Sequence, residues 1–526
     1  MDFFRSWIKI CGLISMTFSM IFIISIFSGC SIKPTPFVAQ DHLKRIDDDR
    51  NKLYGGQESL TEPLTLSMAI ARALKYNFDN RLAMMESVLQ DKQMDLATLE
   101  MLPKLIAGAG YSWRDNTMAS FSVPVENPNN TSGYFTTSQD RERIIEDLTF
   151  SWNILDLGAS YYGAKQQSDR ILIAKEKQRS VINNIIRQVN DAFHNAVTSE
   201  RLLPKVESCL LDANEALEMN HKIEEERLKP LVKVLQYRKD LLKLIDQLNQ
   251  LHHNLIVSKT RLAALINLPL NENYSINFNE EPAFEPPEIK HSIRDLETLG
   301  LYYRHDIREE AYKARINELQ IKKEFIGLFP GLSFSASANH DSNSFLMNNN
   351  WLDLGVETSF KLFNLIKGPR RLAVAKTRVM VDETRRLALS VASLVKINIA
   401  FQKYKQTMES YRTNSLLLQV EKHLQKAISN VTSLKAGSDL ENIRQNASTI
   451  ATLMNRDYAY TGALAALFEL YASIGIDFYD GPVDDISLTQ LMSEIDHRLS
   501  DWQTATLPGI PDVSPDELTN ALSQKE

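Results

Sequence analysis

Few residues of this chain combine a type and a spacing that could support catalysis. His252 and His253 are adjacent, and neighbouring side chains on a helix point about 100° apart, so these imidazoles are not expected to share a metal ion. The run Glu224-Glu225-Glu226 is typical of a solvated helix face rather than of paired catalytic acids. The sequence contains no phosphate-binding loop, no HExxH, no CxxC and no nucleophile elbow. It therefore predicts a protein that is not an enzyme and that uses no cofactor and no metal.

One residue near the N-terminus carries a signal for covalent modification. A basic start with Arg5 and Lys9 precedes an apolar run over residues 10–27, and Ser-Gly then precedes Cys30. This is the composition of a secretory signal. Its end resembles a bacterial lipobox, with Phe27 where lipoproteins usually have leucine, and predicts that Cys30 becomes the lipidated first residue of the mature chain. The alternative is an uncleaved anchor, because eighteen residues is near the lower limit for a membrane span.

Length and charge narrow the class of protein further. At 526 residues, the chain has room for more than one structural region. The formal net charge is -7 with both signs mixed along the sequence, so no basic stripe is available to neutralise the phosphates of a nucleic acid. Cys209 lies in a long helical pattern, where a small buried residue is expected rather than a reactive thiol.

Four segments alternate apolar and polar residues with period two, as strands do. A soluble sheet with one wet face gives this pattern too. However, about ten residues is the length of a tilted strand that crosses a bilayer, and Trp113, Trp152 and Trp351 suit the aromatic belts at its interfaces. The apolar positions are Leu105, Ala107, Ala109, Tyr111 and Trp113; Leu148, Phe150, Trp152 and Ile154; Leu332, Phe334, Ala336 and Ala338; and Leu352, Leu354, Val356, Thr358 and Phe360.

The rest of the chain between these strand pairs has the apolar spacing of helices. We expect long helices at Ser160–Leu228 and Arg370–Ala436, each followed by a shorter one at Leu231–Leu265 and Leu440–Ile474. At 1.5 Å per residue the long helices would extend roughly 100 Å, too far for a globule of this size, so they must pack along one another as coiled coils.

The two halves of the sequence repeat this order. Leu102-Pro103 matches Phe329-Pro330 at an offset of 227 (330 − 103), whereas Leu265–Leu268 matches Ser473–Ile476 at an offset of 208 (475 − 267). The change in length is confined to a polar, turn-rich window between Pro103 and Trp152, as expected of a surface loop.

From Leu64 to Ile476, this order resembles the TolC-like outer-membrane factor family, in its lipoprotein type. The matched motifs are Ala71-Arg72-Ala73-Leu74 with Asn77, the Leu-Pro and Phe-Pro pairs above, Ile154 to Gly158, and Leu262 to Pro269. The resemblance implies an α+β membrane protein, with three chains that each give four strands to a twelve-stranded β-barrel continued by a periplasmic α-helical barrel. It implies that Asp147, Asp353 and Glu357 face the lumen.

The same resemblance implies a periplasmic gate at the two hairpin turns, where an adaptor protein would bind. The residues concerned are Lys229, Pro230 and Leu231 at the first turn and Gly437, Asp439 and Glu441 at the second. Relatives close this end with a ring of aspartates, but the corresponding places here are Ile443 and Asn446. The ion-binding ring therefore does not carry over.

These observations give a division of the chain and a function. The expected parts are 1–29, a signal peptide; 30–62, a lipid-anchored equatorial segment; 63–268, repeat 1; 269–297, an equatorial linker; 298–476, repeat 2; and 477–526, a tail that is partly mobile. The expected function is a passive, homotrimeric exit duct in the outer membrane, opened by a periplasmic adaptor and energised by an inner-membrane transporter. The alternative is a coiled-coil periplasmic adaptor that bridges the two membranes. Drugs, metals and proteins remain equal alternatives as cargo, because the energised partner would select it.

Overall fold

The computed structural model describes residues 34–60, 62–121, 134–226, 230–269, 274–277, 285–434, 439–483, 485–504 and 507–509. The side chains of 431–434, 439–441 and 503 are not described. The predictions made for Cys30, Lys229 and Gly437 therefore lie outside the described residues. The chain divides into two compact units, Met1–Glu58 and Ser59–Glu526, and each is described by itself.

The first unit contains helix α2 (Ala39–Tyr54). All its side chains are exposed, and the carboxylate of Asp41 accepts a hydrogen bond from the backbone N–H of Val38 at 3.0 Å, which satisfies one free donor at the start of the helix.

The second unit is mostly helical with one four-stranded sheet, as the sequence predicts. Its two halves have the same order of elements and nearly the same element lengths. The first half consists of α3 (Leu66–Tyr76), α4 (Phe78–Leu99), β1 (Lys104–Trp113), β2 (Glu142–Asn153), α5 (Ile154–Glu225) and α6 (Leu231–Leu265). The second consists of α7 (Ile293–Tyr303), α8 (His305–Ile326), β3 (Gly331–Asp341), β4 (Asn350–Ser359), α9 (Asn364–Leu434) and α10 (Asp439–Ile474), and α11 (Leu488–Gln503) follows.

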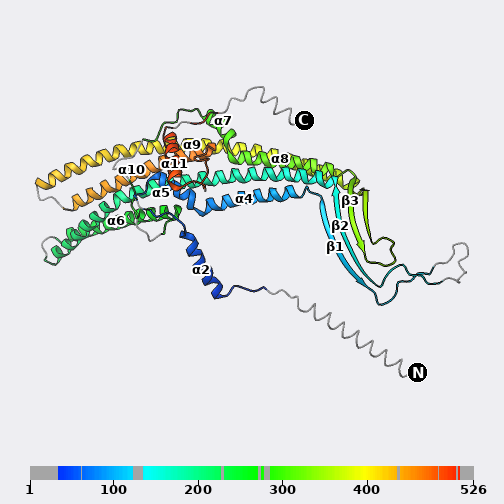
Figure 1. Ribbon diagram of the computed structural model, residues 1–526. Helices are drawn as coiled ribbons and strands as arrows, with labels where there is room; N and C mark the ends of the chain where they lie inside the picture. The colour runs from blue at the N-terminus through cyan, green and yellow to red at the C-terminus, as the bar shows by residue number, and fades with distance from the viewer. Residues whose placement is uncertain are drawn as a thin grey trace, which may run out of the picture. The chain divides into compact units, whose positions relative to one another are not determined.

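The sheet and the helices next to it share one order. The strands are antiparallel in the order β1-β2-β3-β4. Helix α4 leads into β1, β2 leads into α5, α8 leads into β3 and β4 leads into α9, and these helices pack as neighbours in the order α4, α5, α8, α9 (Figure 1). The strand order therefore also sets the order of the helix layer.

The long helices begin earlier than the sequence predicts. Helix α5 starts at Ile154, directly after β2, because the side chain of Asn153 accepts hydrogen bonds from the backbone N–H groups of Leu155 and Asp156 at 2.9 and 3.2 Å. This is the geometry of an N-cap, and asparagine is among the best residues for it. Strand β2 therefore passes into helix α5 without a linker, so the sheet and the helices are directly connected at this point.

The largest hydrophobic core lies at mid-length of α5, where α3 and α10 pack against α5 and α11 packs against α3. Phe478, in the connection from α10 to α11, is fully buried between Phe468 and Trp502, with ring centroids 5.0 and 5.2 Å away. Aromatic groups in such arrangements contribute packing energy beyond the area they bury. The C-terminal tail is thus, as far as Gln503, part of the core.

Helices α6 and α10 end in the same way, at the residues that the repeat aligns. Asn267 and Gly475 both have a positive φ, of 54° and 84°. In each case the next residue's N–H bonds five residues back, Leu268 to Ala263 at 2.9 Å and Ile476 to Tyr471 at 3.1 Å. This is the hydrogen bonding of a Schellman C-cap, whose left-handed residue is usually glycine or asparagine.

Two glycines, one within α10 and one directly after it, are expected to respond in opposite ways to replacement by alanine. At Gly475, a Cβ would lie 2.5 Å from the Arg304 backbone, so Gly475→Ala should destabilise the fold by about 2 kcal/mol or more. At Gly462, within the helix, a Cβ meets nothing within 4 Å, so Gly462→Ala should stabilise it by about 0.5–1 kcal/mol. Thermal unfolding followed by circular dichroism measures both, and equal shifts of the same sign would contradict this account.

Candidate functional site

The sheet has one apolar face. In an antiparallel pair, residues opposite one another point to the same side. The register pairs Phe150 with Leu105 on one neighbour and with Ala336 on the other, and Ala336 pairs with Leu354. The predicted apolar sets of all four strands therefore lie on the same face, and their large side chains are exposed, Leu354 at 87%. An apolar surface of this extent marks contact with a membrane or a partner.

The opposite face is polar and consists largely of small residues. Asp147, Asp353 and Glu357 all lie on it, with Ser151, Ser333, Ser335, Ser337 and Asn339. Asn339 Nδ2 donates to Asp353 Oδ2 at 3.1 Å, and Thr149 Oγ1 donates to Asp147 Oδ2 at 3.1 Å. The three predicted acidic residues thus share one face, and two of them each accept a hydrogen bond from a neighbouring side chain on it.

Glycine allows an acidic side chain to lie flat on this face. Gly108 is the partner of Asp147 across the β1–β2 ladder, and a Cβ at Gly108 would lie 2.3 Å from Asp147 Oδ1. The carboxylate of Asp147 therefore occupies the space that a side chain at position 108 would fill, and it does not project far from the polar face.

Trp351 does not lie on the face where the predicted aromatic belt would have to be. Trp351 precedes Leu352 by one residue and so points to the polar face, where its indole Nε1 donates to Asp353 Oδ2 at 2.9 Å. Trp113 and Trp152 lie on the apolar face, near opposite ends of the sheet. Composition alone did not distinguish these cases, because a shift of one residue reverses the face.

Both edges of the sheet and of the helix layer lack a partner within the described chain. Strand β1 pairs only with β2, and β4 only with β3. On the edge helix α4, exposed residues recur at spacings of four and three: Phe78, Leu82, Met85, Leu89, Lys92, Leu96 and Leu99. On the other edge helix, α9, the exposed apolar residues include Val374, Val381, Leu387, Val391, Val395 and Ile399. A heptad pattern on an exposed face is typical of a coiled-coil contact with another chain.

The predicted gate residues are described only in part. Pro230 is the N-cap residue of α6, and Leu231 begins that helix with 58% of its surface exposed. The backbones of Asp439 and Glu441 belong to the first turn of α10. Their role at a gate remains a prediction.

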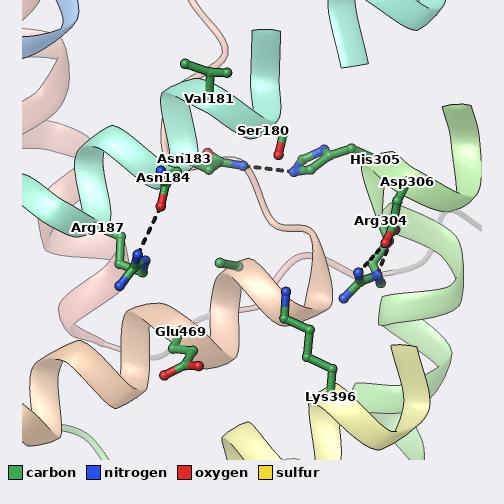
Figure 2. A pocket seen from close by; sticks show the side chains of 11 residues that line it. Ser180, Val181, Asn183, Asn184, Arg187, Arg304, His305, Asp306, Lys396 and Glu469 are labelled. Carbon is green, nitrogen blue, oxygen red and sulfur yellow. Dashed lines mark hydrogen bonds and ion pairs between the residues drawn. The ribbon is translucent and has the colours of Figure 1, made fainter. Parts of the chain in front are cut away.

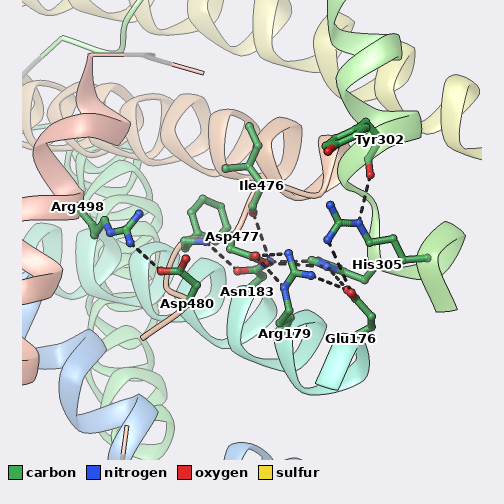
Figure 3. Close-up of polar contacts among 11 residues, drawn as sticks. Glu176, Arg179, Asn183, Tyr302, His305, Ile476, Asp477, Asp480 and Arg498 are labelled. Atoms are coloured by element: carbon green, nitrogen blue, oxygen red, sulfur yellow. Dashed lines mark hydrogen bonds and ion pairs between the residues drawn. The ribbon is translucent and has the colours of Figure 1, made fainter. Parts of the chain in front are cut away.

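A polar cluster that the sequence did not single out joins the two halves of the chain (Figure 3). Arg179 Nη1 contacts Glu176 Oε2 at 2.7 Å, and Arg179 Nε donates to Asp477 Oδ2 at 2.8 Å. Asn183 Nδ2 donates to Asp477 Oδ1 at 3.1 Å and lies 3.2 Å from His305 Nε2. The cluster thus connects α5 to the start of α8 and to the segment after α10.

Charges within this cluster shift the pKa of Glu176. Burial alone would raise its pKa, but the contacts with His305, Arg179 and Arg308 outweigh burial and lower it below the usual 4.5. Burial likewise opposes the charge of Arg179, but Asp477 and Glu176 raise its pKa further. The ion pairs therefore remain charged at neutral pH.

The described residues contain neither a metal site nor a spanning helix. No three His, Cys, Asp or Glu side chains among them come together in a way that could hold a metal ion. None of the described helices combines the length and apolar character that crossing a bilayer would need.

Comparison with known proteins gives a match in structure but not in sequence. No protein-family model matches the chain, and no curated protein matches it. Among solved structures, the Campylobacter jejuni CmeC outer membrane channel matches with a TM-score of 0.63 at 13% identity, over 89% of this chain and 98% of that one. The Neisseria gonorrhoeae MtrE outer membrane channel in its open state matches with a TM-score of 0.60 at 15% identity, over 80% and 91%. The outer-membrane channel OprN matches with a TM-score of 0.60 at 15% identity, over 78% and 89%.

These matches define the class of fold. The chain has the fold of the TolC-like outer-membrane channels, which confirms the fold predicted from its order of elements. The lipoprotein type stays a prediction. The matched proteins are channels rather than enzymes.

The polar cluster gives a prediction about pH. Because the folded-state pKa of Glu176 is below 4.5, its charge stabilises the fold above that pH, and this contribution is lost as the pH falls through the lower folded-state value. Glu176→Gln should therefore lower the melting temperature at pH 7, and the difference from the wild type should persist down to pH 4.5 and shrink at lower pH. Glu409→Gln, which removes an exposed ion pair with Arg412, is the control and should change little at either pH. A deficit for Glu176→Gln that stays constant with pH would contradict the charge argument.

Proposed function

We propose that this chain is a subunit of a passive channel in the outer membrane, built from three copies. The observation that carries the proposal is the sheet, which has one largely apolar face, one polar face and two open edges, and each strand of which continues as a helix. The channel fold of the matched structures supports it. Twelve strands from three chains would close a barrel with the apolar face towards lipid and Asp147, Asp353 and Glu357 towards a water-filled lumen.

The open edges also suggest how the copies join. Strand β1 and helix α4 form one edge, and strand β4 and helix α9 form the other. If β1 of one copy pairs with β4 of the next, the exposed stripe of α4 meets the apolar residues of α9. Such a head-to-tail contact closes into a ring and removes every unpaired strand edge.

Several finer features of the proposal come from the sequence. Cys30 carries lipid that anchors the mature N-terminus to the outer membrane. A periplasmic adaptor opens the hairpin end, and an inner-membrane transporter supplies the energy. The alternative of a coiled-coil adaptor is less well supported, because adaptors have a single hairpin set within lipoyl and small β-barrel domains, whereas this chain has two hairpins and four strands in one sheet.

Assembly is tested at the stripe of α4. Leu89 is 53% exposed in the single chain, and Leu89→Arg would bury a charge in the proposed contact, which should weaken assembly by about 2 kcal/mol or more. Light scattering of the purified protein in detergent should show trimers for the wild type and for the control Leu89→Met, and monomers for Leu89→Arg. Planar-bilayer recordings should show channels only for the trimers. A wild type that is monomeric and without conductance would overturn the proposed function.

The gate is tested by crosslinking at the helical tips. Cysteines replacing Leu231 and Asp439 should form disulfides between neighbouring hairpins, lower the conductance, and lose this effect when a reductant is added. Cys209 does not interfere, because it is buried and burial raises its pKa to about 11. Crosslinked tips that conduct as well as free ones would place the constriction elsewhere.

A further inference from the structure

A cavity of about 500 Å³ lies between α5, the start of α8, α9 and α10, beside the polar cluster (Figure 2). It shares Asn183 and His305 with that cluster, but its other charged groups are different. Arg187 projects from α5, Lys396 from α9 and Glu469 from α10, and Arg304 and Asp306 lie at the start of α8. The volume lies within the range of small-molecule sites.

The carboxylates of the lining are already paired with cations. Asp306 Oδ1 accepts a hydrogen bond from Arg304 Nε at 2.9 Å, and burial, which would raise the pKa of Asp306, is outweighed by the contacts with Arg304 that lower it. Glu469 Oε2 accepts a hydrogen bond from Lys403 Nζ at 2.7 Å. The acidic side of the cavity is therefore neutralised from within the protein.

Two cations of the lining have no ion-pair partner among the described residues. Arg187 Nη2 donates to the amide oxygen of Asn184 at 3.0 Å, a neutral group. Neither Arg187 nor Lys396 forms an ion pair with a carboxylate among the described residues. In Figure 2 the ammonium group of Lys396 reaches from α9 towards the space between α5 and α10, and the guanidinium of Arg187 lies on the other side of that space. Asp191 acts electrostatically on Arg187, and Asp306 on Lys396, but in neither case as an ion pair. The cavity thus has two cationic donors that no carboxylate of the described residues contacts directly.

Other groups add hydrogen-bond donors. At the start of α8, Arg304 provides no side-chain cap, and Asp306 in the first turn accepts a hydrogen bond from the backbone N–H of Ile307 at 3.0 Å, so the helix end itself is already compensated by a carboxylate. The hydroxyl of Ser180 and the amide of Asn184 belong to the same lining and can donate hydrogen bonds.

We infer that this cavity binds a small oxyanion, such as a phosphate or carboxylate group, between Arg187 and Lys396. The guanidinium and the ammonium each give it a charge-assisted hydrogen bond. Since α5 belongs to the first half of the chain and α9 to the second, the bound anion links the two halves beside the polar cluster. The site goes beyond the channel proposal, because it can bind its anion whether or not the chain conducts.

Isothermal titration calorimetry of the full-length protein in detergent, at constant ionic strength, tests this site with inorganic phosphate. Arg187→Gln and Lys396→Gln should each weaken binding about tenfold or more, because each removes one charge-assisted hydrogen bond. Lys396→Arg, which keeps the charge, should retain binding within a few-fold. Lys376→Gln is the matched control, because Lys376 is exposed on α9 twenty residues away, or about 30 Å along the helix. It should bind phosphate as the wild type does.

A second titration with glycerol phosphate distinguishes the source of the anion. Tighter binding of glycerol phosphate than of inorganic phosphate indicates a lipid headgroup, and the reverse order indicates a free anion. The inference is overturned if the wild type binds neither compound at millimolar concentrations. It is also overturned if Lys376→Gln weakens binding as much as Lys396→Gln does, since the effect would then be one of net charge.

Discussion

The hydrogen-bond ladder of the four-stranded sheet is the constraint on which the rest of the second unit depends. Its register places the apolar residues of all four strands on one face and the small polar residues on the other. Since each strand passes into one helix, the same ladder determines which helices are neighbours. A slip of one residue in a single strand would move its apolar residues to the polar face. The same ladder therefore determines both the order of the helices and the separation of apolar from polar residues.

Polar contacts hold the helical layer together where the sheet cannot. Gln167 Nε2 donates to Gln90 Oε1 of α4 at 3.0 Å, and Gln166 Nε2 donates to Gln320 Oε1 of α8 at 3.1 Å. Arg315 of α8 forms an ion pair with the buried Asp169 of α5. A group that is buried and fully paired specifies register, because any shift leaves it unpaired at a cost of about 1–3 kcal/mol. The cluster around Glu176 does the same at mid-length, where the two halves meet.

Much of this fold could be predicted from the sequence, because period and order are local properties. The bounds of α6, the C-cap at Asn267 and its counterpart Gly475, and the alternating faces of the strands all follow from residues that are neighbours in the chain. The contacts of His305 could not be predicted, because its partners Glu176 and Asp477 lie more than a hundred residues away on either side. The face on which Trp351 lies could not be predicted for a different reason, because it depends on the strand register that only the hydrogen-bond ladder determines.

The two ends of the helical layer differ in what can move. At the sheet end, α5 follows β2 without a linker and is capped by Asn153, so displacing the helix would break ladder hydrogen bonds as well. At the far end, the hairpins are held by side-chain packing, in which Leu241, Leu248 and Leu255 of α6 are buried against α5. Packed helices can slide and change their superhelical twist at low cost, whereas a strand ladder moves in steps of two residues. In the proposed duct we therefore expect the gate at the hairpin end, with the paired groups at mid-length as the point beyond which the helices can splay.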